Sequence, residues 1–186
     1  MNLTLLCIRH GQTDWNVEGR YCGQTDISIN EAGRKAAERL AQELSTEQLD
    51  AVYASDLQRA AETARILARP HGLEVQIDAR LRELDQGKWE GLLFSEIKDV
   101  YSEELANRKL DPLSFRAPDG ETVQEMLERV TEAIEEIRRR HQAGGRVLVV
   151  AHGFTLALVR VRYMGIELAR AWDYVPPNTE VVEIHL

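Results

Sequence analysis

The chain has 186 residues, of which 44% are hydrophobic and 29% charged, as in a soluble globular protein with one sizeable core. Its formal net charge of −8 argues against a nucleic-acid-binding protein. It leaves room for a small anionic substrate, because a few Arg and His side chains can set the field of one cleft. The longest apolar stretch, residues 147–159, is too short for a membrane span, and no signal-like segment opens the sequence. We therefore expect one cytoplasmic domain over residues 1–186, monomeric or homodimeric, without nucleic-acid or membrane partners.

The first predicted element is a buried strand over residues 3–8 that ends abruptly in Arg9-His10-Gly11. The carboxyl ends of strands are common places for sites in α/β proteins. Arg matches phosphate oxygens with a fork of donors, and His can act as a nucleophile or a proton carrier. From these residues alone, a functional site and a plain surface or capping role both stay open. Two cysteines, Cys7 and Cys22, fit a reducing compartment.

The next part of the chain predicts a loop, a helix, a strand and a second helix. Residues 17–30 are rich in Gly, Asp, Asn and Ser and predict a loop that lines the same site as His10. Helical spacing follows over residues 31–44, and a short apolar strand over residues 49–54. Ser55 and Gln58 form a capping-box pattern, which predicts a helix from there to about residue 68. Arg59 would then lie in the first turn, where the helix dipole favours an anion.

The middle of the chain predicts a short strand and then a loop of mixed charge. The strand covers residues 74–77, and the loop over residues 81–91 carries three carboxylates whose order in the sequence does not single out one as functional. Residues 94–117 predict short helical pieces, which we expect to form a cap-like segment, about residues 92–118, over the site. A capping box at Thr122 begins a long amphipathic helix over residues 123–141.

A second apolar strand, residues 146–151, ends in His152-Gly153 and repeats the opening pattern. A helix over residues 154–164 and an edge strand over residues 181–186 complete the chain. Strands that alternate with helices predict an α/β domain, a three-layer sandwich with a mostly parallel sheet and helices on both faces. Two strands that each end in His-Gly favour a shared site over an isolated core histidine.

Four motifs in order resemble the histidine phosphatase superfamily, in its phosphatase-type branch, with the phosphoglycerate-mutase-like fold. They are Arg9-His10-Gly11-x-Thr13-x-x-Asn16, Ser55-x-Leu57-x-Arg59-x-x-x-Thr63-Ala64, Leu81-x-Glu83-x-x-x-Gly87-x-Trp89-Glu90-Gly91 and Val150-x-His152-Gly153. The resemblance implies a phosphomonoesterase for small phosphorylated metabolites in which His10 becomes phosphohistidine and Glu83 is the general acid. It further implies that Arg9, Arg59 and His152 hold the phosphoryl oxygens, with no metal and no cofactor. Further contacts to the substrate are expected from Asn16, Cys22, Gly23, Gln24 and Gly153.

Three other interpretations of the same residues compete with a phosphatase. A cofactor-dependent phosphoglycerate mutase of this kind carries a longer basic insertion after the acid, whereas the segment between Gly91 and Gly120 is short. A non-catalytic phosphate-binding protein usually lacks one reacting group, and this chain has all of them. A metal hydrolase with His10, His152 and Glu83 as ligands has no His-x-x-x-His or cysteine cluster to support it.

Overall fold

The computed structural model describes residues 2–186 and contains one five-stranded sheet with the strand order β3-β2-β4-β1-β5. The strands are β1 (Leu3–Arg9), β2 (Ala51–Ala54), β3 (Val75–Ile77), β4 (Gly145–Ala151) and β5 (Val181–His185). Neighbouring strands pair in parallel except β1 and β5, which pair antiparallel at the edge of the sheet. The predicted mostly parallel sheet with a C-terminal edge strand is confirmed.

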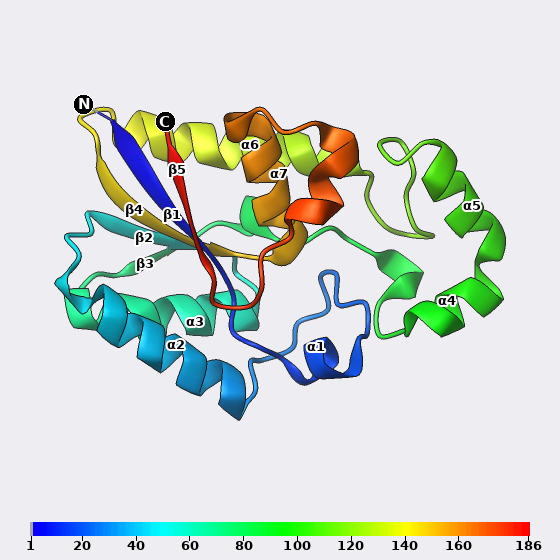
Figure 1. Cartoon of the computed structure of the whole chain (residues 1–186), viewed down its shortest axis with the longest axis horizontal. Coiled ribbons are helices and arrows are strands. Elements are labelled where there is room, and N and C mark those ends of the chain that lie inside the picture. Colours follow the sequence, from blue (N-terminus) through cyan, green and yellow to red (C-terminus); the bar gives the residue numbers. More distant parts are fainter. Residues whose placement is uncertain (1) are drawn as a thin grey trace.

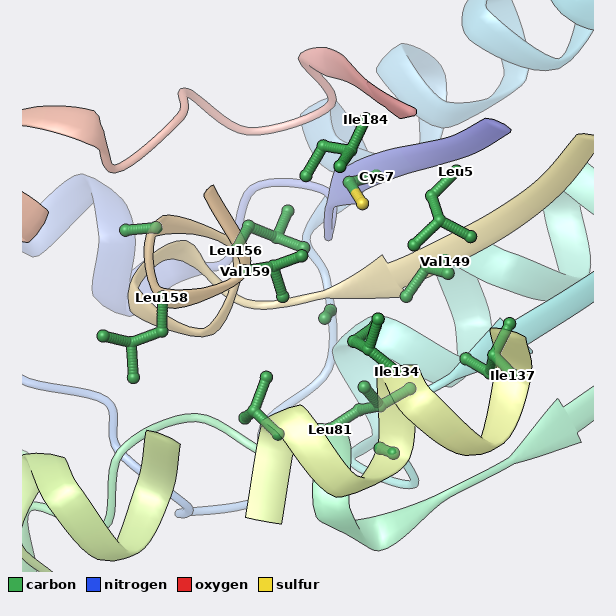
Figure 2. Close-up of a cluster of buried hydrophobic side chains, with 14 of the residues drawn as sticks. Leu5, Cys7, Leu81, Ile134, Ile137, Val149, Leu156, Leu158, Val159 and Ile184 are labelled. Carbon is green, nitrogen blue, oxygen red and sulfur yellow. The ribbon is translucent and has the colours of Figure 1, made fainter. Parts of the chain in front are cut away.

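Helices cover both faces of this sheet, as the alternating pattern predicts (Figure 1). On one face lie α2 (Glu31–Glu43) and α3 (Gln58–Ala68), and on the other α6 (Val123–Arg140) and α7 (Gly153–Met164). Alternate residues of β1 point to opposite faces. Leu5 and Cys7 therefore join the core beneath α6 and α7 (Figure 2), whereas Leu6 and Ile8 join the core beneath α2 and α3.

The cap-like segment contains the short helices α4 (Phe94–Val100) and α5 (Ser102–Leu110). These two helices lie beyond the carboxyl ends of the strands, apart from the four helices of the sandwich (Figure 1). They share a small hydrophobic core in which Trp89, Ile97 and Ala117 are buried. Trp89 belongs to the 81–91 loop that carries the predicted acid, Glu83, so this core packs the cap-like segment against that loop. Among the described residues, no helix combines the length and the apolar character that a bilayer span requires.

Two expected boundaries were wrong, both because a side chain forms a different hydrogen bond. A short helix, α1 (Asp14–Glu18), includes the first two residues of the predicted loop over residues 17–30. Its capping box joins Thr13 to Asn16 instead of to an acidic residue. The helix expected from Ser55 begins at Gln58, and the Ser55 hydroxyl accepts from Leu57 N instead of capping it. The carboxylate of Asp26, from the preceding loop, accepts the Gln58 N–H at 2.7 Å and takes the place of that cap.

Short 3-10 helices fill the remaining turns, at Leu44–Thr46, Arg69–His71, Ala79–Leu81, Gly87–Trp89 and Leu168–Tyr174.

Candidate active site

The sheet brings the two His-Gly motifs together. In the parallel pairing of β1 with β4, Arg9 lies opposite Ala151, so the next residue of each strand is a histidine. The ring centroids of His10 and His152 are 5.2 Å apart. Both rings are buried, with 3% of His10 and none of His152 exposed. The carboxyl edge of the two central strands therefore carries a pair of buried imidazoles.

Hydrogen bonds fix the proton on each ring. His10 Nδ1 lies 2.7 Å from the Gly11 carbonyl oxygen, which can only accept, so the proton is on Nδ1 and Nε2 has a free lone pair. His152 Nδ1 accepts from Arg59 Nε at 3.2 Å, so its own proton is on Nε2. That Nε2 is buried and has no hydrogen-bond partner among the described residues. The pair thus offers one nucleophilic nitrogen and one unused N–H donor.

Both imidazoles are held in the neutral form. Burial, together with the positive charges of Arg59 and Arg9, holds the pKa of His10 well below its usual value. Burial and Arg59 act in the same direction on the pKa of His152. A neutral imidazole is the form that attacks phosphorus, so His10 is in the required state at neutral pH.

The lowered pKa values predict a loss of stability in mild acid. Below a pH of about 6.5, the pKa of histidine in the unfolded chain, the unfolded chain binds protons that the folded chain excludes. The free energy of unfolding therefore decreases as the pH is lowered. In His152→Asn the amide oxygen can accept from Arg59 in place of Nδ1. The substitution thus removes one buried imidazole with a lowered pKa and keeps its hydrogen bond. Urea unfolding between about pH 7 and pH 5 should give a shallower pH dependence for this variant than for wild type. His185→Gln, at an exposed position, is the control, and equal slopes for wild type and His152→Asn would contradict the assignment.

The two predicted arginines have different hydrogen-bond partners. Arg9 Nη1 donates to the Pro176 carbonyl at 2.9 Å, while its Nε is buried and without a partner among the described residues. Arg59 is fully buried, and besides its bond to His152 it donates to the carbonyls of Thr25 and Gly23 at 2.8 and 2.6 Å. These bonds use three of the five N–H groups of Arg59. Arg59 therefore fixes the 23–25 loop as well as His152.

A cavity of about 250 Å³ adjoins this edge of the sheet. Six of the predicted site residues line it: Arg9, Asn16, Cys22, Gly23, Glu83 and Gly153. His10 and His152 are the chain neighbours of the lining residues Arg9 and Gly153, and Arg59 donates to the carbonyl of the lining residue Gly23. Gln24 does not line it, because its amide donates to the Glu83 carbonyl and its oxygen accepts from Arg82.

The structure separates the three carboxylates of the 81–91 loop. Only Glu83 lines the cavity, and its carboxylate accepts from Phe154 N at the start of α7, at 2.9 Å, and from Leu84 N. Asp85 accepts from Gly87 N, which closes a turn. Glu90 accepts from the backbone of Gln24 and Thr25 and is used to hold that loop. Glu83 is therefore the carboxylate that a molecule in the cavity can reach.

Two glycines leave space that a side chain would fill. A Cβ on Gly153 would lie 2.8 Å from Val175 Cγ1 and 3.3 Å from Arg9 Nε, so any larger residue would displace Val175 and press against the Arg9 guanidinium. Gly23 has a φ of +49°, and a Cβ there would lie within bonding distance of the Glu90 carboxylate. Neighbouring side chains thus already fill the space that a Cβ would need at both positions.

Comparison with known proteins supports the same family that the motifs resemble. The model of the histidine phosphatase superfamily (branch 1) matches residues 5–186. The chain belongs to this superfamily. It is 35% identical over 182 residues to phosphoserine phosphatase 1 of Hydrogenobacter thermophilus, covering 98% of this chain and 86% of the relative. It is 39% identical over 152 residues to phosphoglycerate mutase-like protein 4 of Arabidopsis thaliana, covering 80% of this chain and 66% of the relative.

Solved structures of other members share its fold. The alpha-ribazole phosphatase from Shigella flexneri superposes with a TM-score of 0.89 at 27% identity, over 97% of this chain and 89% of that one. This histidine phosphatase therefore has the phosphoglycerate-mutase-like architecture that the motifs imply.

Several residues shape the site of this histidine phosphatase through bonds that the sequence does not reveal. Of these, Thr63 belongs to the second motif, whereas Asn178 and Arg129 belong to none. Thr63 Oγ1 accepts from Gly11 N and donates to the Arg59 carbonyl, so it joins two motifs. Asn178 donates to the His10 carbonyl at 2.8 Å and contacts the Asn16 side chain. These residues act on backbone groups from distant parts of the chain, and only the fold shows which partners they meet.

Arg129 of α6 is the strongest example. Its guanidinium donates to the carbonyls of Arg80, Arg82 and Glu83 at 2.8 to 2.9 Å, and it is paired with Glu121. It thus holds the backbone on which the Glu83 carboxylate is mounted. A positional error of about 1 Å at a reacting group can cost on the order of 100-fold in rate.

We expect Arg129→Met to slow phosphoryl transfer from alkyl phosphates by about 100-fold, through misplacement of Glu83. Transfer from activated aryl phosphates, whose leaving group needs little protonation, should suffer much less. Single-turnover kinetics with both esters measure the difference, and Arg138→Met, an exposed position on the same helix, is the matched control. Equal losses for the two esters would mean that Arg129 supports the fold without positioning Glu83.

Among the described residues, no group of three or more His, Cys, Asp or Glu side chains is arranged to hold a metal ion. His10 and His152 instead use their Nδ1 atoms for the Gly11 carbonyl and Arg59.

Proposed function

We propose that this chain is a phosphomonoesterase that hydrolyses small phosphorylated metabolites through a phosphohistidine on His10. One observation carries the proposal. The free Nε2 of His10 lies in a buried group with two donors that have no partner among the described residues, His152 Nε2–H and Arg9 Nε–H. Buried donors without partners are costly unless a ligand satisfies them, and phosphoryl oxygens are acceptors that suit both.

In the first step the His10 lone pair attacks phosphorus, and the bond from phosphorus to the ester oxygen breaks. Arg9, Arg59 and His152 hold the non-bridging oxygens and stabilise the charge that develops on them. Glu83, which faces the same cavity, donates its proton to the leaving alkoxide. The products of this step are the free alcohol, phosphohistidine and the Glu83 carboxylate.

In the second step water attacks phosphohistidine and the P–N bond breaks. The Glu83 carboxylate takes the proton of the attacking water, and His10 recovers its lone pair. Inorganic phosphate leaves, and the enzyme returns to its starting protonation state. Each residue of the scheme is used in both steps, and no metal is required.

A phosphoglycerate mutase is the second candidate, because a relative 39% identical to this chain is named as mutase-like. A mutase returns the phosphoryl group to an alcohol, whereas a phosphatase gives it to water. The names of other relatives, a phosphoserine phosphatase and an alpha-ribazole phosphatase, support the transfer to water.

Parallel assays of the purified chain distinguish these activities. We expect phosphate release from a panel of alkyl phosphate monoesters, undiminished by a chelator. We expect no interconversion of phosphoglycerates in a coupled assay primed with bisphosphoglycerate. Mutase turnover faster than phosphate release would favour the second candidate, and loss of all activity in chelator would favour a metal hydrolase.

Three further expectations belong to the same proposal. The segment 92–118, which supplies Arg108 to the cavity lining, acts as a cap on the leaving-group side. The enzyme works in the cytoplasm, as its free cysteines favour. It acts on its substrate as a monomer or a homodimer, without nucleic acid.

A further inference from the structure

A second, larger cavity of about 720 Å³ lies beside the catalytic one, between the helices α4 and α5 and the 168–174 segment. Tyr21, Arg108 and Trp172 line both cavities, so the two are neighbours that share one wall. Residues of α4 and α5 line one side of this cavity. The two helices lie beyond the carboxyl ends of the strands (Figure 1). The scheme for phosphoryl transfer uses only the smaller cavity.

A column of flat groups leads from the acid into the larger cavity. Phe154, whose backbone N–H holds the Glu83 carboxylate, stacks on Trp172 with ring centroids 3.8 Å apart. The Arg108 guanidinium also lies over the Trp172 ring, 4.5 Å from its centroid. The stacked pair of Phe154 and Trp172 thus forms a wall that extends from the cavity with Glu83 to the larger cavity.

The lining of the larger cavity is mostly apolar, with Phe94, Leu105 and Pro112 opposite Trp172. Phe94 and Trp172 are 55% and 42% exposed, which is unusual for large rings unless they meet a partner. The volume lies in the range of pockets that enclose an organic ligand. Its charged lining residues are Lys98 and Arg108, both cations, so an ammonium group is disfavoured there.

We infer that the substrate is the phosphate monoester of a bulky, flat, largely apolar alcohol, neutral or anionic, whose ring system occupies the cavity beneath α4 and α5. This inference rests on the proposed phosphatase activity and narrows its substrate class. A small zwitterionic alcohol such as serine would leave the apolar walls uncovered and bring its ammonium group toward Lys98 and Arg108. Contact with the apolar walls at Phe94, Leu105 and Pro112 supplies binding that only a large apolar group receives.

The test compares ethyl phosphate with 2-(1-naphthyl)ethyl phosphate, two primary alkyl esters with similar leaving-group basicity. We expect kcat/KM to be about 100-fold higher for the naphthyl ester, because only its ring fills the cavity. Phe94→Ala should reduce this ratio. Val100→Ala removes a side chain that is exposed on the same helix and does not line the cavity, and should leave the ratio at its wild-type value.

Separate outcomes identify which proposal fails. Equal kcat/KM for the two esters, with phosphohistidine formed from both, would overturn the substrate class and leave the phosphatase activity intact. Failure of both esters to phosphorylate His10 would overturn the phosphatase proposal and this inference with it. Thermal melting checks that Phe94→Ala is folded. If this variant kept the high wild-type ratio of kcat/KM between the two esters, the ring would bind elsewhere and the inference would be contradicted.

Discussion

Replacing His10 by alanine should abolish phosphate release while leaving the fold intact. The variant removes the attacking nitrogen, and enzymes that lose their nucleophile fall in kcat by on the order of a million-fold. Arg9, Arg59 and His152 would still surround the anion position, so inorganic phosphate should still bind. Steady-state turnover of alkyl phosphates measures the loss, and thermal melting checks the fold.

The matched control for this variant is His185→Ala, which removes an exposed imidazole whose one hydrogen bond among the described residues is with Thr4 Oγ1. Its turnover should equal that of wild type. Substantial turnover by His10→Ala would mean that water attacks the ester directly, and the covalent scheme would have to be abandoned.

Replacing Glu83 by glutamine should produce the second-largest effect, and the effect should depend on the leaving group. Glutamine keeps the size of the side chain and removes the proton that the alkoxide needs. Single-turnover phosphorylation by an alkyl phosphate should slow by roughly 100- to 10,000-fold, the usual contribution of general acid catalysis. Phosphorylation by an activated aryl phosphate should slow much less, because a phenolate leaves without a proton.

The later hydrolysis of phosphohistidine should slow for both esters, since the same carboxylate must then act as the base. Transient kinetics separate the two steps, which steady-state rates would combine. Asp85→Asn is the control, because Asp85 caps the Gly87 turn and does not line the cavity. If Glu83→Gln slowed both phosphorylation reactions equally, Glu83 would not be the acid.

The layers of the fold follow directly from patterns in the sequence. The all-apolar runs of β1 and β4 match strands that are buried on both faces, and the amphipathic stripe of α6 matches its buried face. The start of α3 was missed because its first N–H is bound by Asp26, a partner thirty-two residues away. Local capping patterns cannot show a bond of that kind.

The sequence predicts which residues belong to the site better than it predicts how their side chains are arranged. The sequence places His10 and His152 at strand ends, but their contact depends on the pairing of β1 with β4, which no motif specifies. Gln24 occupies the expected loop, yet its side chain supports the backbone of Glu83. The choice of Glu83 over its two acidic neighbours likewise rests on which carboxylate faces the cavity.

The central claim, a covalent phosphoryl group on His10, is tested most directly by trapping it. Wild-type enzyme mixed with a labelled phosphate monoester and quenched in alkali within the first turnover should carry one phosphoryl group per active site. Peptide mapping should locate it on His10, and it should be stable in base and lost in acid. Release of labelled phosphate with no phosphoenzyme at any time, or a label on another residue, would contradict the account.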